Sequence, residues 1–336
     1  MIYDKPFMEN RDLLKHVHDK HNLAIENESF ALTALISMTY YDLINGYKDC
    51  FMVDDHFCDC ISIEYLYQFS LLDKSFQSIL FKYSVYIERI FKNALAYSLA
   101  KNFSVDKHIY LDLSNYVYSN NPGRVKKLMK TIADINKVAD ESDDQPTLHY
   151  RTHKNHIPPW ILFRNVNFNS SIDLYTFLKY DEKKIVIKAI LTKDIPSTYK
   201  YELIKTSLTI VRKFRNKIAH NLIFVSHRLR EKLSLSFLMS EFGGTLLTQV
   251  DITEHVGESD PYSMILSLIL LQPDNFLVNQ FAKDILLLVN EYKSNSQNSI
   301  ILLEYCELTS IPYDIDLRLK KYIAKINNEK ELKGSK

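Results

Sequence analysis

Hydrophobic residues recur every three or four positions along most of this chain, the spacing at which side chains share one face of an α-helix. The longest such stripe lies within residues 61–103, and its inward positions are Phe76, Leu80, Tyr83, Ile87, Ile90 and Ala94. A second stripe predicts a helix over residues 124–138, with Val125, Leu128, Ile132 and Ile135 inward. Stripes of this width are typical of helices that bury one side in a bundle.

The same pattern predicts helices along the rest of the chain. Before the long stripe they span residues 9–17 and 28–38, with Asn27 as a cap, and after it residues 161–178, 182–191 and 199–220. In the last third they span residues 274–293, 300–308 and 314–327, and Asp260-Pro261 marks a further helix start. Only 6 Gly and 9 Pro interrupt 336 residues. We therefore expect an all-α fold, with one domain over residues 1–230 and a helical extension over residues 231–336.

One stripe is broken by a charge. Its inward positions are Ile204, Leu208, Val211, Arg215, Ile218 and Leu222. A guanidinium at an inward position is costly unless it is paired or lines a polar cleft. Asn216 and His220 are four residues apart, so they share a helix face beside Arg215, and Asn221 is a suitable left-handed end to the helix. Arg for phosphoryl charge and His for proton transfer suit a phosphodiester substrate.

The bare spacing of Arg, four residues and His is not specific, because Arg11 with His16 and Arg151 with His156 repeat it. Its structural alternative is an Arg that caps carbonyls and a His satisfied in the core. The longer string Arg215-Asn216-Lys217-Ile218-Ala219-His220-Asn221 resembles the Arg-Asn-x-x-x-His signature of HEPN domains, which are helical RNA-cutting or RNA-binding modules.

A second string points to a family. Tyr40-Tyr41-Asp42-Leu43-Ile44-Asn45-Gly46-Tyr47 resembles the Asn-Tyr-Tyr-Arg-Leu-Ser-Gly-Tyr signature of Abi-like abortive-infection proteins, the AbiD/AbiF group of phage-defence factors. Lys5-Pro6-Phe7 is similar to their opening, and Pro158-Pro159-Trp160-Ile161 to their Pro-x-Trp segment. Three residues depart from the pattern: Asp42 replaces the usual Arg, Asn45 replaces Ser, and Asn221 replaces the second His of many members. From the residues alone, the Tyr40–Tyr47 string reads as an aromatic helix end with Gly46 as its cap.

The resemblance implies a HEPN-type helical bundle with additional N- and C-terminal helices, acting on RNA in phage defence. It implies metal-independent cleavage without a cofactor, in which His220 is a general base or acid, Arg215 stabilises phosphoryl charge and Asn216 orients His220 or holds a phosphate oxygen. A Glu-Arg pair similar to Glu88-Arg89 lies in the matching family helix, so Glu88 would orient Arg215. HEPN ribonucleases generally bring two motifs together; one copy per chain therefore implies a homodimer. Two alternatives stay open: a non-cleaving protein that holds a structured small RNA, and a protein-interaction scaffold.

RNA binding would have to come from local patches, because the formal net charge is only +1. The first candidate patch is His149, Arg151, His153, Lys154 and His156, where Tyr150 is available to stack on a base. Its structural alternative is a solvated loop. The second candidate patch follows the Arg215 motif and comprises Arg212, Lys213, Lys217, Arg228 and Arg230, with Lys232 beyond it.

The cysteines and the longest apolar run do not indicate a further function. Cys50, Cys58 and Cys60 lie near His56, but without the paired spacing of a zinc site, so we expect buried thiols and no metal. Four cysteines are too few and too unevenly spread for a disulfide scaffold. The longest apolar run, residues 265–271, is far too short to span a bilayer. With no apolar signal region at the N-terminus, we expect a cytoplasmic protein without membrane partners.

Overall fold

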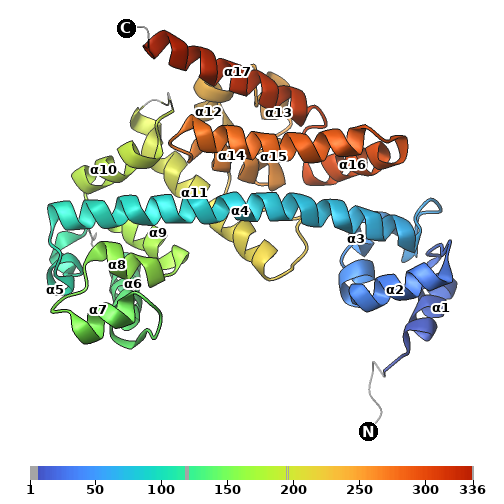
Figure 1. Ribbon diagram of the computed structural model, residues 1–336, viewed down its shortest axis with the longest axis horizontal. Helices are drawn as coiled ribbons and strands as arrows, with labels where there is room; N and C mark the ends of the chain where they lie inside the picture. The colour runs from blue at the N-terminus through green and yellow to red at the C-terminus, as the bar shows by residue number, and fades with distance from the viewer. Residues whose placement is uncertain (1–6, 118–120, 194, 196, 335–336) are drawn as a thin grey trace.

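The fold is all-α, as the hydrophobic pattern predicts. The computed structural model describes residues 7–117, 121–193, 195 and 197–334. Within these residues the strands are β1 (Met52–Val53) and β2 (His56–Phe57), which form one antiparallel hairpin. The long stripe becomes α4 (Ile63–Asn102), a helix that runs across the whole molecule (Figure 1). Ser62 caps it by accepting a hydrogen bond from the Tyr65 amide, and its predicted inward positions are buried except for Ile90, which is half-buried.

A small group of helices lies at the first turns of α4. They are α1 (Asn10–His21), α2 (Glu28–Ser37), the single π-helical turn η1 (Tyr41–Asn45) and α3 (Lys48–Phe51). The Asn27 side chain accepts from the amide of Phe30, so the predicted cap of α2 is confirmed. Of the family's opening segment, Lys5 and Pro6 lie outside the described residues, and Phe7 is exposed.

A larger group lies at the opposite end of α4. It comprises α5 (Lys107–Tyr110), the 3-10 turn η2 (Leu113–Asn115), α6 (Pro122–Glu141), α7 (Thr147–His153), α8 (Pro159–Asn165), α9 (Phe168–Phe177) and α10 (Tyr180–Ile190). The single helix predicted over residues 161–178 is wrong, because Val166 and Asn167 are extended and Asn167 caps a new helix. The alternative of a loop over residues 149–156 is also wrong over its first half, which is helical in α7.

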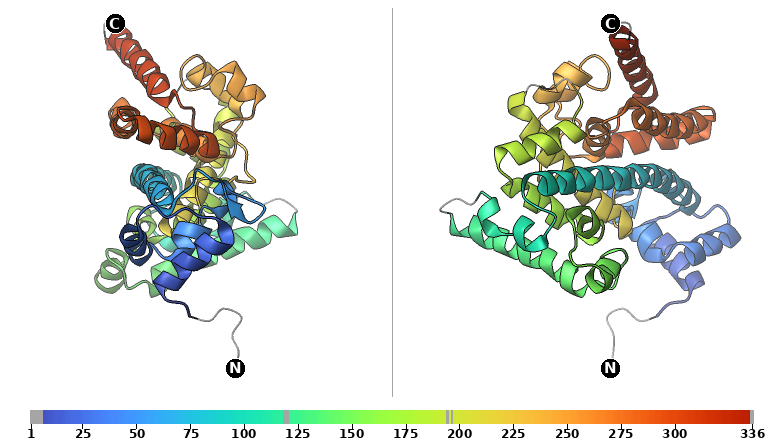
Figure 2. Two further views of the ribbon diagram at one scale, coloured as in Figure 1. Left: turned by 90° about the vertical axis from the view of Figure 1, so that its right-hand side faces the viewer. Right: turned by 60° about the vertical axis from the view of Figure 1, so that its left-hand side comes forward.

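The last helices lie along the other side of α4. They are α12 (Leu235–Phe242), α13 (Gln249–Thr253), α14 (Pro261–Leu270), α15 (Asn275–Lys293), α16 (Ser296–Thr309) and α17 (Ile315–Gly334). Figure 2 shows α17 and α1 at opposite ends of the molecule. Every residue of α14 is buried, and it packs against both α4 and α11 (Ser197–Ala219). The apolar run at residues 265–271 therefore belongs to a core helix, which packs the C-terminal helices against α4 and α11. The domain boundary at residue 230 stays a prediction. Within the described part of the chain, no helix has the length and apolar character that a bilayer span requires.

Candidate functional site

The end of α11 carries the charged motif. Ile204, Leu208 and Val211 are fully buried, as the stripe predicts. Leu222 is 50% exposed and corrects the prediction, because the helix stops at Ala219 and the periodicity stops with it. Asn221 has a φ of 53°, so the predicted left-handed end of the helix is confirmed.

Arg215 is fixed by a carboxylate on the neighbouring helix. Its Nη2 atom lies 3.0 Å from Oε2 of Glu88 on α4, and the Lys92 ammonium lies 2.6 Å from the other oxygen of Glu88. The guanidinium is also 5.9 Å from the centre of the Phe81 ring. Only 13% of the Glu88 side chain and 29% of the Arg215 side chain are exposed, so the pair is partly desolvated. Glu88 therefore has the contact expected of a residue that orients Arg215.

The other two motif residues lie differently. Nη1 of Arg215 donates to Oδ1 of Asn216 at 3.4 Å, so these two side chains are in contact. His220 is exposed, and no side-chain hydrogen bond of His220 occurs within the described part of the chain. It is five positions after Arg215, an offset that corresponds to about 140° around a helix. One chain brings Arg215 and Asn216 into contact, whereas His220 is exposed, makes no hydrogen bond with Arg215 in the described residues and is not the core histidine of the structural alternative.

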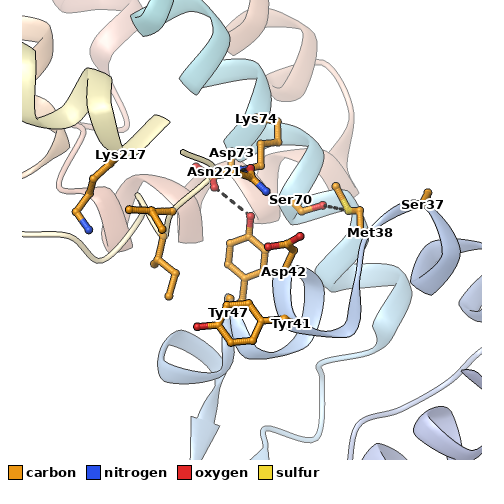
Figure 3. A pocket seen from close by; sticks show the side chains of 13 residues that line it. Ser37, Met38, Tyr41, Asp42, Tyr47, Ser70, Asp73, Lys74, Lys217 and Asn221 are labelled. Atoms are coloured by element: carbon orange, nitrogen blue, oxygen red, sulfur yellow. Dashed lines mark hydrogen bonds between the residues drawn. The ribbon is translucent and has the colours of Figure 1, made fainter. Parts of the chain in front are cut away.

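The two family strings meet at a cleft of about 360 Å³ (Figure 3). Figure 3 shows labelled side chains of the Tyr40–Tyr47 segment, of α4 and of the end of α11 gathered around this cleft. The lining residues are Ser37, Met38, Tyr41, Asp42, Gly46, Tyr47, Ser70, Asp73, Lys74, Lys217, Asn221, Leu222 and Ile223. Lys74 donates to Oδ1 of Asn221 at 2.5 Å and so fixes the residue that ends the helix. Segments more than a hundred residues apart thus form one site.

A buried carboxylate holds the cleft together. Asp73 is 2% exposed and accepts hydrogen bonds from the hydroxyl of Tyr47 at 3.0 Å and the amide of Gln77 at 2.7 Å. The hydroxyl of Tyr305, on α16, donates to its other oxygen at 3.3 Å. Burial raises the pKa of Asp73, and the hydrogen bonds of Gln77 and Tyr47 oppose that rise. Asp73 therefore links three parts of the fold by hydrogen bonds: the Tyr40–Tyr47 segment, α4 and α16.

Gly46 of the family string is the C-cap of the π-turn η1, as the sequence predicts. Its φ of −63° is in the right-handed region, so a left-handed backbone is not the reason for a glycine here. A Cβ at this position would overlap the carbonyl oxygen of Asp42. Because η1 is a π-turn, the chain after it comes back close to its own backbone, and only glycine fits there.

The predicted basic patch after the motif is smaller in the structure than in the sequence. Lys213 lies 2.5 and 2.6 Å from the two oxygens of Glu231. The guanidinium of Arg228 donates to the carbonyl of Leu308 and to Ser310, so it caps the end of α16. Arg212 is half-buried, and burial lowers its pKa. Of the five members of this patch, Lys213 alone has an ion pair with an acidic side chain in the described ranges, while Lys217 lines the cleft and Arg230 is exposed.

The earlier patch lies on α7, away from the cleft. The rings of His149 and His153 stack with centres 4.9 Å apart, and Lys154 is exposed. Arg151 lies 3.8 Å from Asp143, and Nδ1 of His156 lies 2.7 Å from Oδ1 of Asn155. None of these predicted RNA-binding residues lines the cleft.

Two residues of the cleft, and one histidine that contacts α11, were missed in the sequence. Asp73 and Lys74 lie on α4, and Asp73 is in phase with Phe76 and Leu80, so a carboxylate at an inward position was a usable signal. His227 packs edge-on against Phe214, with ring centres 5.9 Å apart. Burial, and then the charges of Lys217, Arg228 and Lys213, lower its pKa to about 4. No pattern in the sequence marks His227.

The cysteine-rich segment differs from its prediction as well. Cys58 and Cys60 are exposed, not buried, because they follow the hairpin at the surface. In the ranges that the structure describes, no three His, Cys, Asp or Glu side chains are grouped as metal ligands.

Comparison with known proteins adds one match. The family model described as "Abi-like protein" matches residues 33–225, which is more than half of the chain and includes both motif strings and Glu88. No curated protein and no solved structure matches.

Proposed function

The chain belongs to the Abi-like protein family, and on this premise we propose that it is a phage-defence protein that acts in abortive infection by cutting RNA. The observation that carries the proposal is the fixed Arg215, which Glu88 holds beside Asn216 on the last turn of α11. The exposed His220 follows directly. These groups supply positive charge and a titratable proton carrier at one helix end.

The proposed chemistry is that of a HEPN-type endoribonuclease without a metal ion. His220 removes the proton of a ribose 2′-OH or protonates the leaving 5′-oxygen. Arg215 stabilises the charge that develops on the phosphoryl oxygens, and Asn216 holds one of these oxygens. Because the nucleophile is a 2′-OH, the substrate is RNA and the product end is a 2′,3′-cyclic phosphate.

The complete site requires two copies of the chain. His220 follows the last residue of α11 and makes no hydrogen bond with Arg215, so we propose a symmetric homodimer in which His220 of each copy faces Arg215 of the other. Leu222 and Ile223 are 50% and 40% exposed beside His220 and supply apolar area for such a contact. Lys217, Arg230 and the α7 residues would guide RNA to the site in the cytoplasm. Sedimentation of the protein at micromolar concentration tests the dimer; a mass of one chain, with and without RNA, contradicts it.

Incubation of the purified protein with cellular RNA in chelator tests the chemistry. Cyclic-phosphate ends should appear, and a substrate with deoxyribose at the cut should stay intact. The His220→Ala variant should remove the activity, whereas His108→Ala, a control at an exposed histidine on α5, should not. Intact RNA in every sample, together with tight binding of one structured RNA, would favour the RNA-holding function instead.

A further inference from the structure

A second pocket, of about 730 Å³, lies at the opposite end of α11 from the motif. It is bounded by α10, the first turns of α11, the start of α6 and the residues that follow α9. Lys200 on its rim is twenty positions before His220, which is about 30 Å along a helix. The pocket is therefore a separate site from the cleft at the family motif.

The cations of this pocket are its main feature. Six of its lining residues are basic: Arg124, Lys179, Lys183, Lys184, Lys188 and Lys200. No acidic residue is among those that line it, and none of the six forms an ion pair with Asp or Glu in the described part of the chain. This is unusual in a chain with a net charge of +1, where lysines such as Lys213 and Lys92 have carboxylate partners. Six unpaired cations around one concavity produce a strong local positive potential.

The packing inside the pocket keeps some of these cations in place. The Lys183 ammonium lies 4.3 Å from the centre of the Tyr201 ring, and the Arg124 guanidinium lies 5.5 Å from that of Phe177. Burial lowers the pKa of Lys183, and the charges of Arg124 and Lys205 lower it further. Bringing an anion into the pocket would relieve this repulsion, so the site is electrostatically suited to a ligand with several negative charges.

The pocket also offers surfaces for a planar ring. Tyr180 is 77% exposed at its edge, and Tyr201 is half-buried in its wall beside Ile187 and Leu191. Aromatic faces next to cations are the combination with which proteins bind nucleotides, because the ring stacks on the base while the cations contact phosphate. A volume of this size matches a compact ligand, since small-molecule sites typically enclose roughly 300–1,000 Å³.

We propose that this pocket binds a nucleotide with several phosphates, either a free nucleoside triphosphate or the 5′-triphosphate end of an RNA. The lysines contact the phosphates, and Tyr180 or Tyr201 stacks on the base. The site is too far from His220 to take part in the cut, so it either anchors an RNA by its end or senses a free nucleotide. The proposal does not depend on RNA cleavage.

Binding measurements with the full chain test the proposal. The probes are a nucleoside triphosphate, the matching monophosphate, inorganic triphosphate, and one short RNA with either a 5′-triphosphate or a 5′-hydroxyl. The triphosphate nucleotide, the triphosphate RNA or both should bind about tenfold more tightly than the partner probe that lacks the extra phosphates. Which of the two binds identifies the source of the ligand. Equal affinity within both pairs overturns the proposal.

Two sets of variants locate the ligand. Lys184→Gln combined with Lys188→Gln should weaken binding about tenfold and flatten its dependence on salt. The control combines Lys283→Gln with Lys321→Gln, which removes the same charge from exposed positions on α15 and α17 and should change nothing. Tyr180→Ala should weaken the nucleotide but not inorganic triphosphate. Unchanged binding in the pocket variants, or inorganic triphosphate binding as tightly as the nucleotide, contradicts the assignment. Cleavage by the same proteins reports separately on His220.

Discussion

The two ends of α11 differ in how their cations are held, because the C-terminal end includes cations paired with carboxylates beside Lys217, which is unpaired in the described part of the chain. At the C-terminal end, Arg215 lies 3.0 Å from Glu88 and Lys213 lies 2.5 Å from Glu231. At the N-terminal end, Lys200 and the cations of the 730 Å³ pocket have no ion pair with a carboxylate in the described residues. A paired cation is held in one geometry and has part of its charge offset, whereas an unpaired one keeps its charge for an external anion. The comparison suggests a site of fixed geometry at one end and a site of strong potential at the other.

The largest expected effect is on RNA cleavage, from a change at the C-terminal end of α11. Arg215→Ala should reduce RNA cleavage by about 10²- to 10³-fold, since that is the typical loss when one charge-stabilising donor is removed. Phage protection should disappear while the melting temperature changes little. Arg89→Ala is the control, because Arg89 is exposed and adjacent to Glu88 in sequence. Full phage protection by a folded Arg215→Ala protein would show that the C-terminal end of α11 is not the catalytic site.

Removal of Asp73, the buried carboxylate of the cleft, should have an effect of similar size in free energy, but on unfolding instead of on cleavage. Asp73→Ala removes the acceptor for Tyr47, Gln77 and Tyr305, and leaving these buried donors unpaired should lower the free energy of unfolding by about 3 kcal/mol. Tyr47→Phe removes one of the donors and should cost about 1 kcal/mol. Urea denaturation measures both. If the two variants lose the same free energy, Asp73 is not the centre of the network.

Glu88→Gln should have a smaller effect on cleavage than loss of Arg215. The guanidinium remains, but its anchor is neutral, so we expect about a tenfold decrease in kcat from looser positioning, with little change in KM. Glu254→Gln, at an exposed carboxylate after α13, is the matched control. A variant with wild-type kcat would mean that the ion pair holds the fold and not the reacting arginine.

The sequence predicted the fold better than the site. Hydrophobic periodicity located α4 and α11, because their inward faces are continuous, and it located Arg215 because the charge interrupts such a face. It merged α8 with α9, since the break at Val166 is made by backbone conformation and a cap. The cleft and the basic pocket bring together residues from several helices, and spacing along one helix does not predict which helices become neighbours.

A pH-dependent effect on stability is expected from His227, which packs against the C-terminal part of α11. Burial and nearby cations lower the pKa of His227 to about 4, below the unfolded value of about 6.5. As the pH falls from about 6.5 towards 4, the unfolded chain gains a proton that the folded chain does not, so stability decreases. Discounted for partial exposure, the loss between pH 7 and pH 5 is on the order of 1 kcal/mol.

His227→Gln should remove this loss, as measured by denaturation of both proteins at each pH. Asp260 acts in the opposite direction, because burial raises its pKa to about 6 and stability then increases as the pH falls through that value. Its contribution is the same in both proteins and cancels in the difference. Parallel pH profiles of wild type and variant would place His227 in solvent and not beside Lys217, Arg228 and Lys213.

The smallest effect compares the two ends directly. Lys188→Gln removes a cation four residues after Lys184, and like charges at this spacing repel by about 0.2–0.5 kcal/mol, so the variant should be slightly more stable than the wild type at low salt. Lys213→Gln removes the partner of Glu231 and should be less stable by about 0.5 kcal/mol. Gln and Lys have nearly equal helix propensities, so the charge dominates both differences. Salt screens both interactions, and therefore the two stabilities should converge on that of the wild type as ionic strength rises. Two variants that shift in the same direction would mean that the cations at the N-terminal end are paired in solution, and the contrast between the ends would no longer hold.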